Sequence, residues 1–154
     1  MSENRPWTNA VFTRMLSSKR RDVFRAWTRE KEVAIWWGPH GFTNPVCKWN
    51  AKQKGSIYLE MISPDGMSFP LKGFFHDVIE PEQFIFTTTA FKEQLEILTA
   101  VILTEVNDKT KLTVEATVMK AIPEVYCFLE TMYEGWKQSL DKLEIHLNTP
   151  EQTI

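Results

Sequence analysis

The stretch "PEVYCFLETMYEGWKQSLDKLEIHL" (residues 123–147) carries large apolar side chains three or four residues apart along its whole length. These side chains are Leu129, Met132, Trp136, Leu140, Leu143 and Leu147. The spacing gathers them on one face of an α-helix, and Pro123 fits the first helical position because its fixed φ suits a helix start. The stretch therefore predicts one amphipathic helix of roughly 24 residues, about 36 Å long.

The sequence before this helix alternates between apolar and polar residues, which is the period of a β-strand. Turn-forming stretches such as "SPDG" (63–66) and "NDKT" (107–110) interrupt the alternation. The predicted strands are 42–50, 56–62, 67–79, 84–90, 95–106 and 111–118. Consecutive strands joined by short turns pair antiparallel, so the sequence predicts a meander.

The first forty residues add one strand and two short helices to this plan. Residues 10–16 alternate as a strand, whereas residues 17–29 and 30–37 have helical spacing. Gly38 and Pro39 then end the second helix, because glycine caps a helix and proline cannot continue it. The order predicts an α+β fold in which a curved antiparallel sheet of six or seven strands wraps around the long C-terminal helix.

We expect residues 1–154 to form a single domain, with 148–154 as a frayed polar tail. A curled sheet covered by one long helix leaves a gap wherever a facing side chain is small or the helix stands off. The architecture therefore predicts an internal apolar cavity between the sheet and the C-terminal helix.

The composition excludes several classes of partner. The net charge is −2 with both signs interspersed, which gives no electrostatic argument for a nucleic-acid partner. No apolar run is long enough for a membrane span, and "MSENRPWTNA" (1–10) lacks the apolar region of a signal peptide.

The two cysteines, Cys47 and Cys127, lie far apart and outside any metal-binding spacing. We therefore expect two buried thiols in a reducing compartment. The expected location is the cytoplasm.

Four stretches, taken in order, carry a resemblance to a known family. They are "VFRAWTREKEVAIWWGP" (23–39), "KGSIYLEMISPDG" (54–66), "FPLKGFFHDVIEPEQFIFT" (69–87) and "YEGWKQSLDKL" (133–143). Over about residues 10–147 the chain resembles the activator of Hsp-90 ATPase homologue-like proteins. These belong to the helix-grip superfamily, with the START lipid-transfer domains, the birch-pollen-allergen (Bet v 1-like) proteins and the polyketide cyclases. The resemblance implies the helix-grip fold and a cavity for apolar ligands.

In that family's architecture, the short helices and the loop after them close one end of the cavity. The resemblance therefore places Trp37, His40 and Phe42 at its entrance, and Trp36 facing inward to the core. Two interpretations of these aromatic residues stay open: a gate that contacts a ligand, or a hydrophobic plug on the sheet with His40 solvated beside it. Further candidate ligand-binding residues are Ile57, Leu59, Met61, Leu71, Phe75, Leu112, Val114, Tyr126, Glu130, Tyr133 and Trp136.

No motif in the chain carries a recognisable catalytic mechanism. There is no GxSxG or HExxH, the glycines are scattered singly, and the three histidines lie far apart. We therefore expect no catalytic residue, no metal and no other cofactor. A binding protein is favoured over an enzyme.

The sequence leaves the oligomeric state open, and a homodimer is possible. It also leaves three functions open. The first is binding of a small apolar or aromatic molecule in the cavity. The second is a protein-interaction module with a chaperone partner. The third is a cyclase-like or hydrolase-like enzyme that uses Tyr126, Tyr133, Glu130 or His40.

Overall fold

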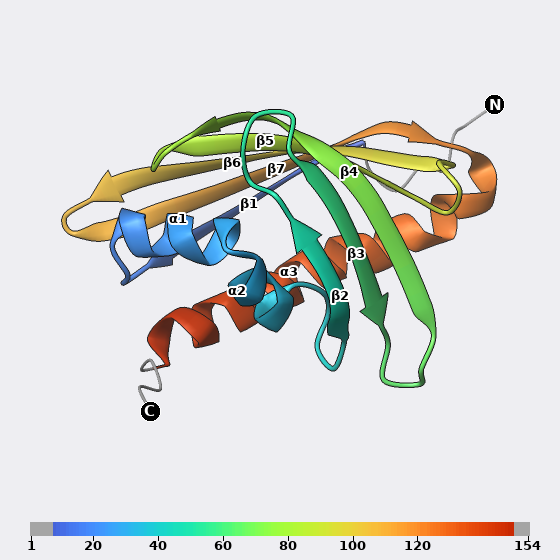
Figure 1. Cartoon of the computed structure of the whole chain (residues 1–154), viewed down its shortest axis with the longest axis horizontal. Helices are drawn as coiled ribbons and strands as arrows, with labels where there is room; N and C mark the ends of the chain where they lie inside the picture. Colours follow the sequence, from blue (N-terminus) through green and yellow to red (C-terminus); the bar gives the residue numbers. More distant parts are fainter. Residues whose placement is uncertain (1–7, 150–154) are drawn as a thin grey trace.

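The computed structural model describes residues 8–149, which form a seven-stranded antiparallel sheet with helices on one side (Figure 1). Its strands are β1 (Asn9–Leu16), β2 (Thr43–Trp49), β3 (Ser56–Ile62), β4 (Ser68–Ile79), β5 (Gln83–Ala90), β6 (Leu95–Val106) and β7 (Lys109–Ala121). The strand order is β1-β7-β6-β5-β4-β3-β2. The predicted meander is therefore confirmed, and β1 joins it at the far edge of β7.

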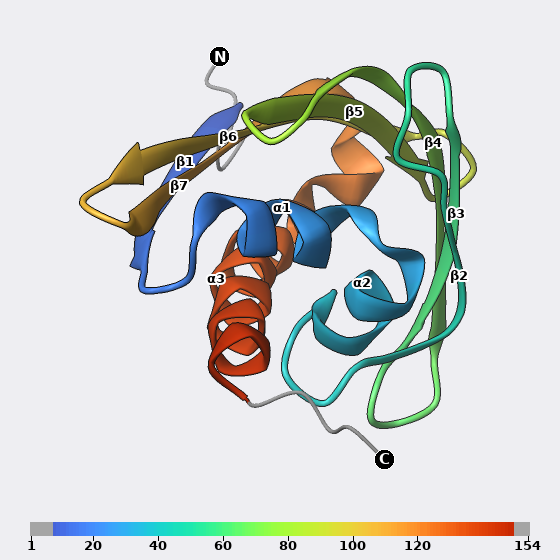
Figure 2. The ribbon, with the colours of Figure 1, turned by 60° about the vertical axis from the view of Figure 1, so that its left-hand side comes forward.

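The sheet bends strongly along its length, so that it encloses the helices on its concave face (Figure 2). The register shifts within three strand pairs, at Thr43/Val46, Phe75/Asp77 and Glu96/Ile97. Such bulges add local twist and bend a strand, which helps a sheet to curl.

Within residues 8–149, three α-helices and one 3₁₀ turn complete the fold. They are α1 (Arg20–Thr28), α2 (Glu30–Trp36), the turn Pro123–Val125 and α3 (Tyr126–Asn148). Proline occupies the start of the 3₁₀ turn rather than of the α-helix itself, which begins three residues later than the sequence predicts. All three α-helices lie inside the curve of the sheet (Figure 2). The predicted α+β helix-grip architecture is thus confirmed.

Aromatic rings fill the space where α1, α2 and α3 meet the sheet. Trp27 lies 4.6 Å from Trp36 and 6.2 Å from Trp136, measured between ring centroids. The rings around them belong to Phe24, Trp37, Trp49, Phe75, Phe84 and Phe86. The indole N–H groups of Trp36 and Trp49 donate to the carbonyls of Ala26 and Trp27, at 2.9 and 2.8 Å. These bonds satisfy the indole N–H groups of Trp36 and Trp49, whereas the buried indole nitrogen of Trp27 has no hydrogen-bond partner among residues 8–149.

One expectation about the cysteines is wrong. Cys47 is half-buried on β2, but Cys127 is exposed on α3, because it lies on the outer side of the helix while its neighbour Leu129 faces the core. Within residues 8–149, no helix is both long and apolar enough to cross a membrane.

Candidate functional site

The segment after α2, residues 37–42, turns sharply and returns along the side of α3. Trp37 ends the helix, and Gly38 follows with a φ of +96°, a conformation that glycine adopts at little cost. Asn44 donates to the carbonyls of Ala34 and Trp37, at 3.0 and 2.9 Å, and so satisfies acceptors that the end of α2 leaves open.

Side chains of α3 hold this segment in place. Ser139 Oγ accepts a hydrogen bond from Gly38 N–H at 3.0 Å, and Gln138 Oε1 accepts one from His40 N–H at 2.9 Å. Lys142 Nζ donates to three consecutive carbonyls, those of Trp37, Gly38 and Pro39, at 3.2–3.4 Å. Burial lowers the pKa of Lys142, because the half-buried ammonium loses hydration. We call this set of contacts the clasp; it fixes the segment against α3.

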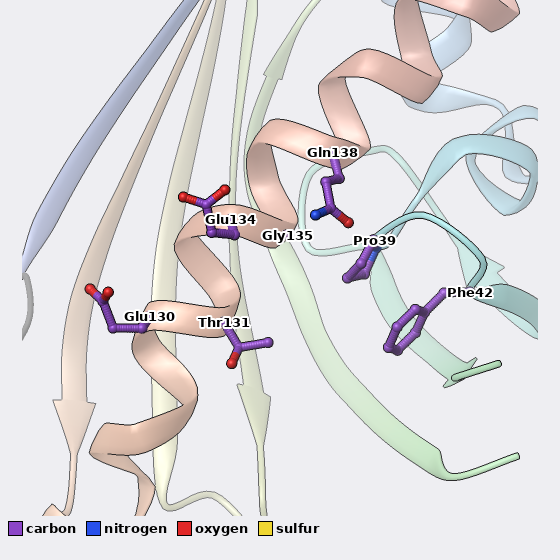
Figure 3. A pocket seen from close by; sticks show the side chains of 7 residues that line it. All are labelled: Pro39, Phe42, Glu130, Thr131, Glu134, Gly135 and Gln138. Carbon is purple, nitrogen blue, oxygen red and sulfur yellow. The ribbon is translucent and has the colours of Figure 1, made fainter. Parts of the chain in front are cut away.

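A hollow of about 370 Å³ opens beside the clasp, between the segment and the middle of α3 (Figure 3). We call it the α3 groove. Its lining residues are Pro39, Phe42, Glu130, Thr131, Glu134, Gly135 and Gln138. Phe42 and Pro39 form the apolar side of the groove, and the polar side chains come from α3 (Figure 3).

Two packing features shape the apolar side of the α3 groove. Gly135 is buried, and a Cβ built on it would lie 3.2 Å from Pro39 Cγ, so glycine allows the segment to approach the helix closely. The ring of Phe42 packs against Phe69 of β4, with centroids 6.0 Å apart. The groove therefore has one wall, at Phe42, that the sheet supports. At Gly135, its surface on α3 carries no side chain.

The predicted site residues other than His40 fall into three groups. Phe42 and Glu130 line the α3 groove. Most of the others are buried in the aromatic and aliphatic core: Trp37, Ile57, Leu59, Phe75, Leu112, Val114 and Trp136. Four are partly buried and pack against that core: Met61, Leu71, Tyr126 and Tyr133. Contact of any of these residues with a ligand stays a prediction.

His40 lies on the surface, with 57% of its side chain exposed and Nε2 3.9 Å from the Asp141 carboxylate. This partner is a hundred residues away in sequence and comes from α3, so the local sequence gave no sign of it. The pair is solvent-exposed and does not line the α3 groove.

A second hollow, of about 850 Å³, lies between α1, α2 and the C-terminal half of α3. We call it the α1–α3 hollow. Its lining residues are Ser18, Asp22, Arg25, Arg29, Glu32, Ile35, Lys142, Ile145, His146, Leu147 and Thr149. Glu32 accepts from His146 Nε2 at 2.9 Å and pairs with Arg25 Nε at 3.3 Å. The sequence did not predict this network of charged side chains, because Arg25, Glu32 and His146 come from three different helices.

The same hollow exposes two large apolar side chains. Ile35 of α2 is 60% exposed and Ile145 of α3 is 64% exposed, the two highest fractions among the large apolar residues of 8–149. Apolar groups exposed together beside charged ones are typical of a contact surface.

The titratable residues give no sign of a metal centre. In the part of the chain that the structure describes, no group of three or more histidine, cysteine, aspartate or glutamate side chains is placed to hold a metal ion. Burial, with a smaller contribution from the nearby Glu30 carboxylate, raises the pKa of Cys47 to about 11. A thiol with that pKa is almost entirely protonated at neutral pH, so it is a weak nucleophile.

Solved structures of bacterial proteins share this fold over nearly their whole length. A protein from Chromobacterium violaceum is 23% identical, with a TM-score of 0.81, over 93% of this chain and 99% of that one. A protein from Arthrobacter aurescens is 16% identical, with a TM-score of 0.82, over 97% and 91%. The AHSA1 protein from Silicibacter pomeroyi is 19% identical, with a TM-score of 0.76, over 90% and 96%. No curated protein matches the chain.

The family is established by the sequence itself rather than by these structures. Residues 17–148 match the family model described as Activator of Hsp90 ATPase homolog 1-like protein. The match takes in α1, α2, the clasp, most of the sheet and α3. The chain therefore belongs to the Activator of Hsp90 ATPase homolog 1-like family, within the START-like helix-grip proteins.

Proposed function

We propose that this domain binds a small, largely apolar or aromatic molecule, and that the α3 groove is where it binds. The observation that carries the proposal is the groove itself, about 370 Å³ in volume and bounded by Phe42 and Gly135. Its volume falls in the range of ligand pockets, roughly 300–1,000 Å³. The clasp supports the proposal because hydrogen bonds within the protein hold one wall of the groove against α3, and a wall held in this way costs less to order when a ligand binds.

The lining chemistry narrows the ligand. Phe42 and Pro39 offer an aromatic face and a flat apolar ring, which suit a planar apolar group. Thr131 and Gln138 project from α3 towards Pro39 and Phe42, whereas the carboxylates of Glu130 and Glu134 point away from them (Figure 3). We therefore expect an apolar ligand that can form a hydrogen bond with the Thr131 hydroxyl or the Gln138 amide. The negative charge of the two nearby glutamates should disfavour a ligand carboxylate.

A groove-filling substitution tests this proposal. Thr131 is exposed and lines the groove, so Thr131→Trp should fill it without disturbing the core. Lys137→Trp adds the same ring at an exposed position of α3 outside the groove lining. The probe is N-phenyl-1-naphthylamine, an aromatic amine whose fluorescence rises in apolar surroundings.

We expect Thr131→Trp to raise the Kd of the probe at least tenfold, and Lys137→Trp to leave it within a factor of two. Circular dichroism should show that both variants keep the fold. Equal affinity of all three proteins would place the probe elsewhere and contradict the proposal.

A second candidate function is a protein contact, and the α1–α3 hollow favours it. The exposed Ile35 and Ile145 provide an apolar surface, and the family description suggests the Hsp90 chaperone as the partner. If that contact exists, Ile35→Ser with Ile145→Ser should weaken capture of Hsp90 and any stimulation of its ATPase activity. The same pair should leave probe binding in the α3 groove unchanged, so the two candidates can be separated.

A further inference from the structure

The two edge strands of the sheet differ in how their backbones are covered. At the β2 edge, the Glu30 carboxylate accepts the Trp49 N–H at 2.9 Å, and the Glu30 carbonyl lies 3.7 Å from the Cys47 thiol. Pro45, in the same strand, has no N–H to offer. The start of α2 thus closes this edge to another strand.

The β1 edge has no such cover in the part of the chain that the structure describes. Val118 N–H donates to the Thr8 carbonyl at 2.8 Å, and the register then pairs Ala10 with Ala116. In an antiparallel pair, bonded residues alternate with residues whose N–H and C=O point away. The outward-pointing residues of β1 are therefore Asn9, Val11, Thr13 and Met15.

The side chains along β1 leave this edge open. Val11 is 55% and Met15 is 50% exposed, and both lie on the convex face beside the edge. Arg14 is the only charged residue of β1, and it faces α3. Its guanidinium reaches Asp141 at 2.9 Å and Glu144 at 3.4 Å, so it is held by the helix of its own chain.

We propose that β1 pairs antiparallel with β1 of a second copy of this chain, about a two-fold axis at Phe12, so that the two sheets become continuous. In this register Val11 lies opposite Thr13 of the other copy, and Asn9 lies opposite Met15. Every outward-pointing residue then exchanges backbone hydrogen bonds with a counterpart. An axis at Val11 or at Thr13 would leave one end residue of each edge without a partner inside the strand.

The side chains suit this register. Arg14 lies opposite Ala10 of the other copy, so no like charges face each other and the arginine keeps its partners on α3. In this register, every outward-pointing backbone group of β1 is paired by the same strand of the other copy. This self-complementarity favours a second copy over an unrelated extended peptide as the partner. The axis also preserves the faces, since both concave surfaces stay on the same side.

Sedimentation of the full chain over roughly 1–500 μM tests the proposal. The unchanged protein should show a concentration-dependent dimer. Val11→Lys with Thr13→Lys sets lysines directly opposite lysines across the proposed pairing, and should raise the dimer Kd at least a hundredfold. The control is Ile102→Lys with Thr104→Lys, which adds the same charge to exposed positions of β6, two strands from the edge.

The register is tested by oxidative crosslinking in a Cys127→Ser background. Val11→Cys mixed with Thr13→Cys should give a crosslinked dimer, whereas Thr13→Cys alone should not. A monomer at all concentrations would overturn the proposal. So would a dimer that both lysine pairs weaken equally, or one that the edge lysines leave intact.

Discussion

Replacement of Trp37 by alanine tests how much the packing of this residue, whose carbonyl takes part in the clasp, contributes to stability. Trp37 is 8% exposed, and its ring centroid lies 5.1 Å from that of Trp49 and 5.5 Å from that of Trp136. Burying roughly 200 Å² of aromatic surface at about 25 cal/mol per Å² is worth about 5 kcal/mol, of which alanine keeps a part. We therefore expect Trp37→Ala to lower the free energy of unfolding by about 3–5 kcal/mol.

The assay is urea unfolding followed by far-ultraviolet circular dichroism, because the remaining tryptophans complicate fluorescence. Trp37→Phe keeps an aromatic ring and should lose less than half as much stability. His40→Ala removes an exposed side chain and should change stability by no more than about 0.5 kcal/mol. A loss below 1 kcal/mol for Trp37→Ala would refute the packing argument and favour the alternative, in which Trp37 is a movable gate.

The remaining predictions concern the clasp, the thiols and the α1–α3 hollow. Lys142→Met should lower the free energy of unfolding by about 1 kcal/mol, because the loss of three hydrogen bonds is partly offset by no longer burying a charge. It should also weaken probe binding. Urea unfolding measures the first effect and probe titration the second. The exposed Cys127 should react with a disulfide reagent first. The Cys47 pKa, raised from 9.0 to about 11, should make its thiolate roughly a hundredfold scarcer at pH 8, so its labelling rate should keep rising until pH 11. Glu32→Gln should cost about 1–2 kcal/mol in urea unfolding, since the partly buried Arg25 and His146 lose their shared carboxylate; an unchanged midpoint would contradict this.

The periodic elements were predictable because their signals are local. The alternation in 56–62 and 95–106 marks β3 and β6 to the residue, since each strand buries one face and is bounded by turn residues. The strand β7 extends beyond its predicted end at Val118 to Ala121, because pairing with the long β6 outlasts the alternation.

The site was less predictable, because it depends on which helix face meets which loop. The sequence predicts ligand contacts for Phe42 and Glu130 but not for the other five lining residues, because the resemblance assigns them no contact with a ligand. These are Pro39, Thr131, Glu134, Gly135 and Gln138. A glycine in the middle of the predicted helix, Gly135, is the signal in the sequence for a close approach to that helix. The partner of Gln138 is a backbone N–H almost a hundred residues away, and no sequence pattern encodes such a contact.

The most direct test of the proposed function is an ¹⁵N–¹H chemical-shift titration of the full chain with N-phenyl-1-naphthylamine. Binding in the α3 groove predicts the largest shifts at the amides of Phe42, Thr131 and Gly135, with small shifts at Ile35 and Ile145. Shifts centred on Ile35 and Ile145, or no saturable shifts at all, would contradict the account.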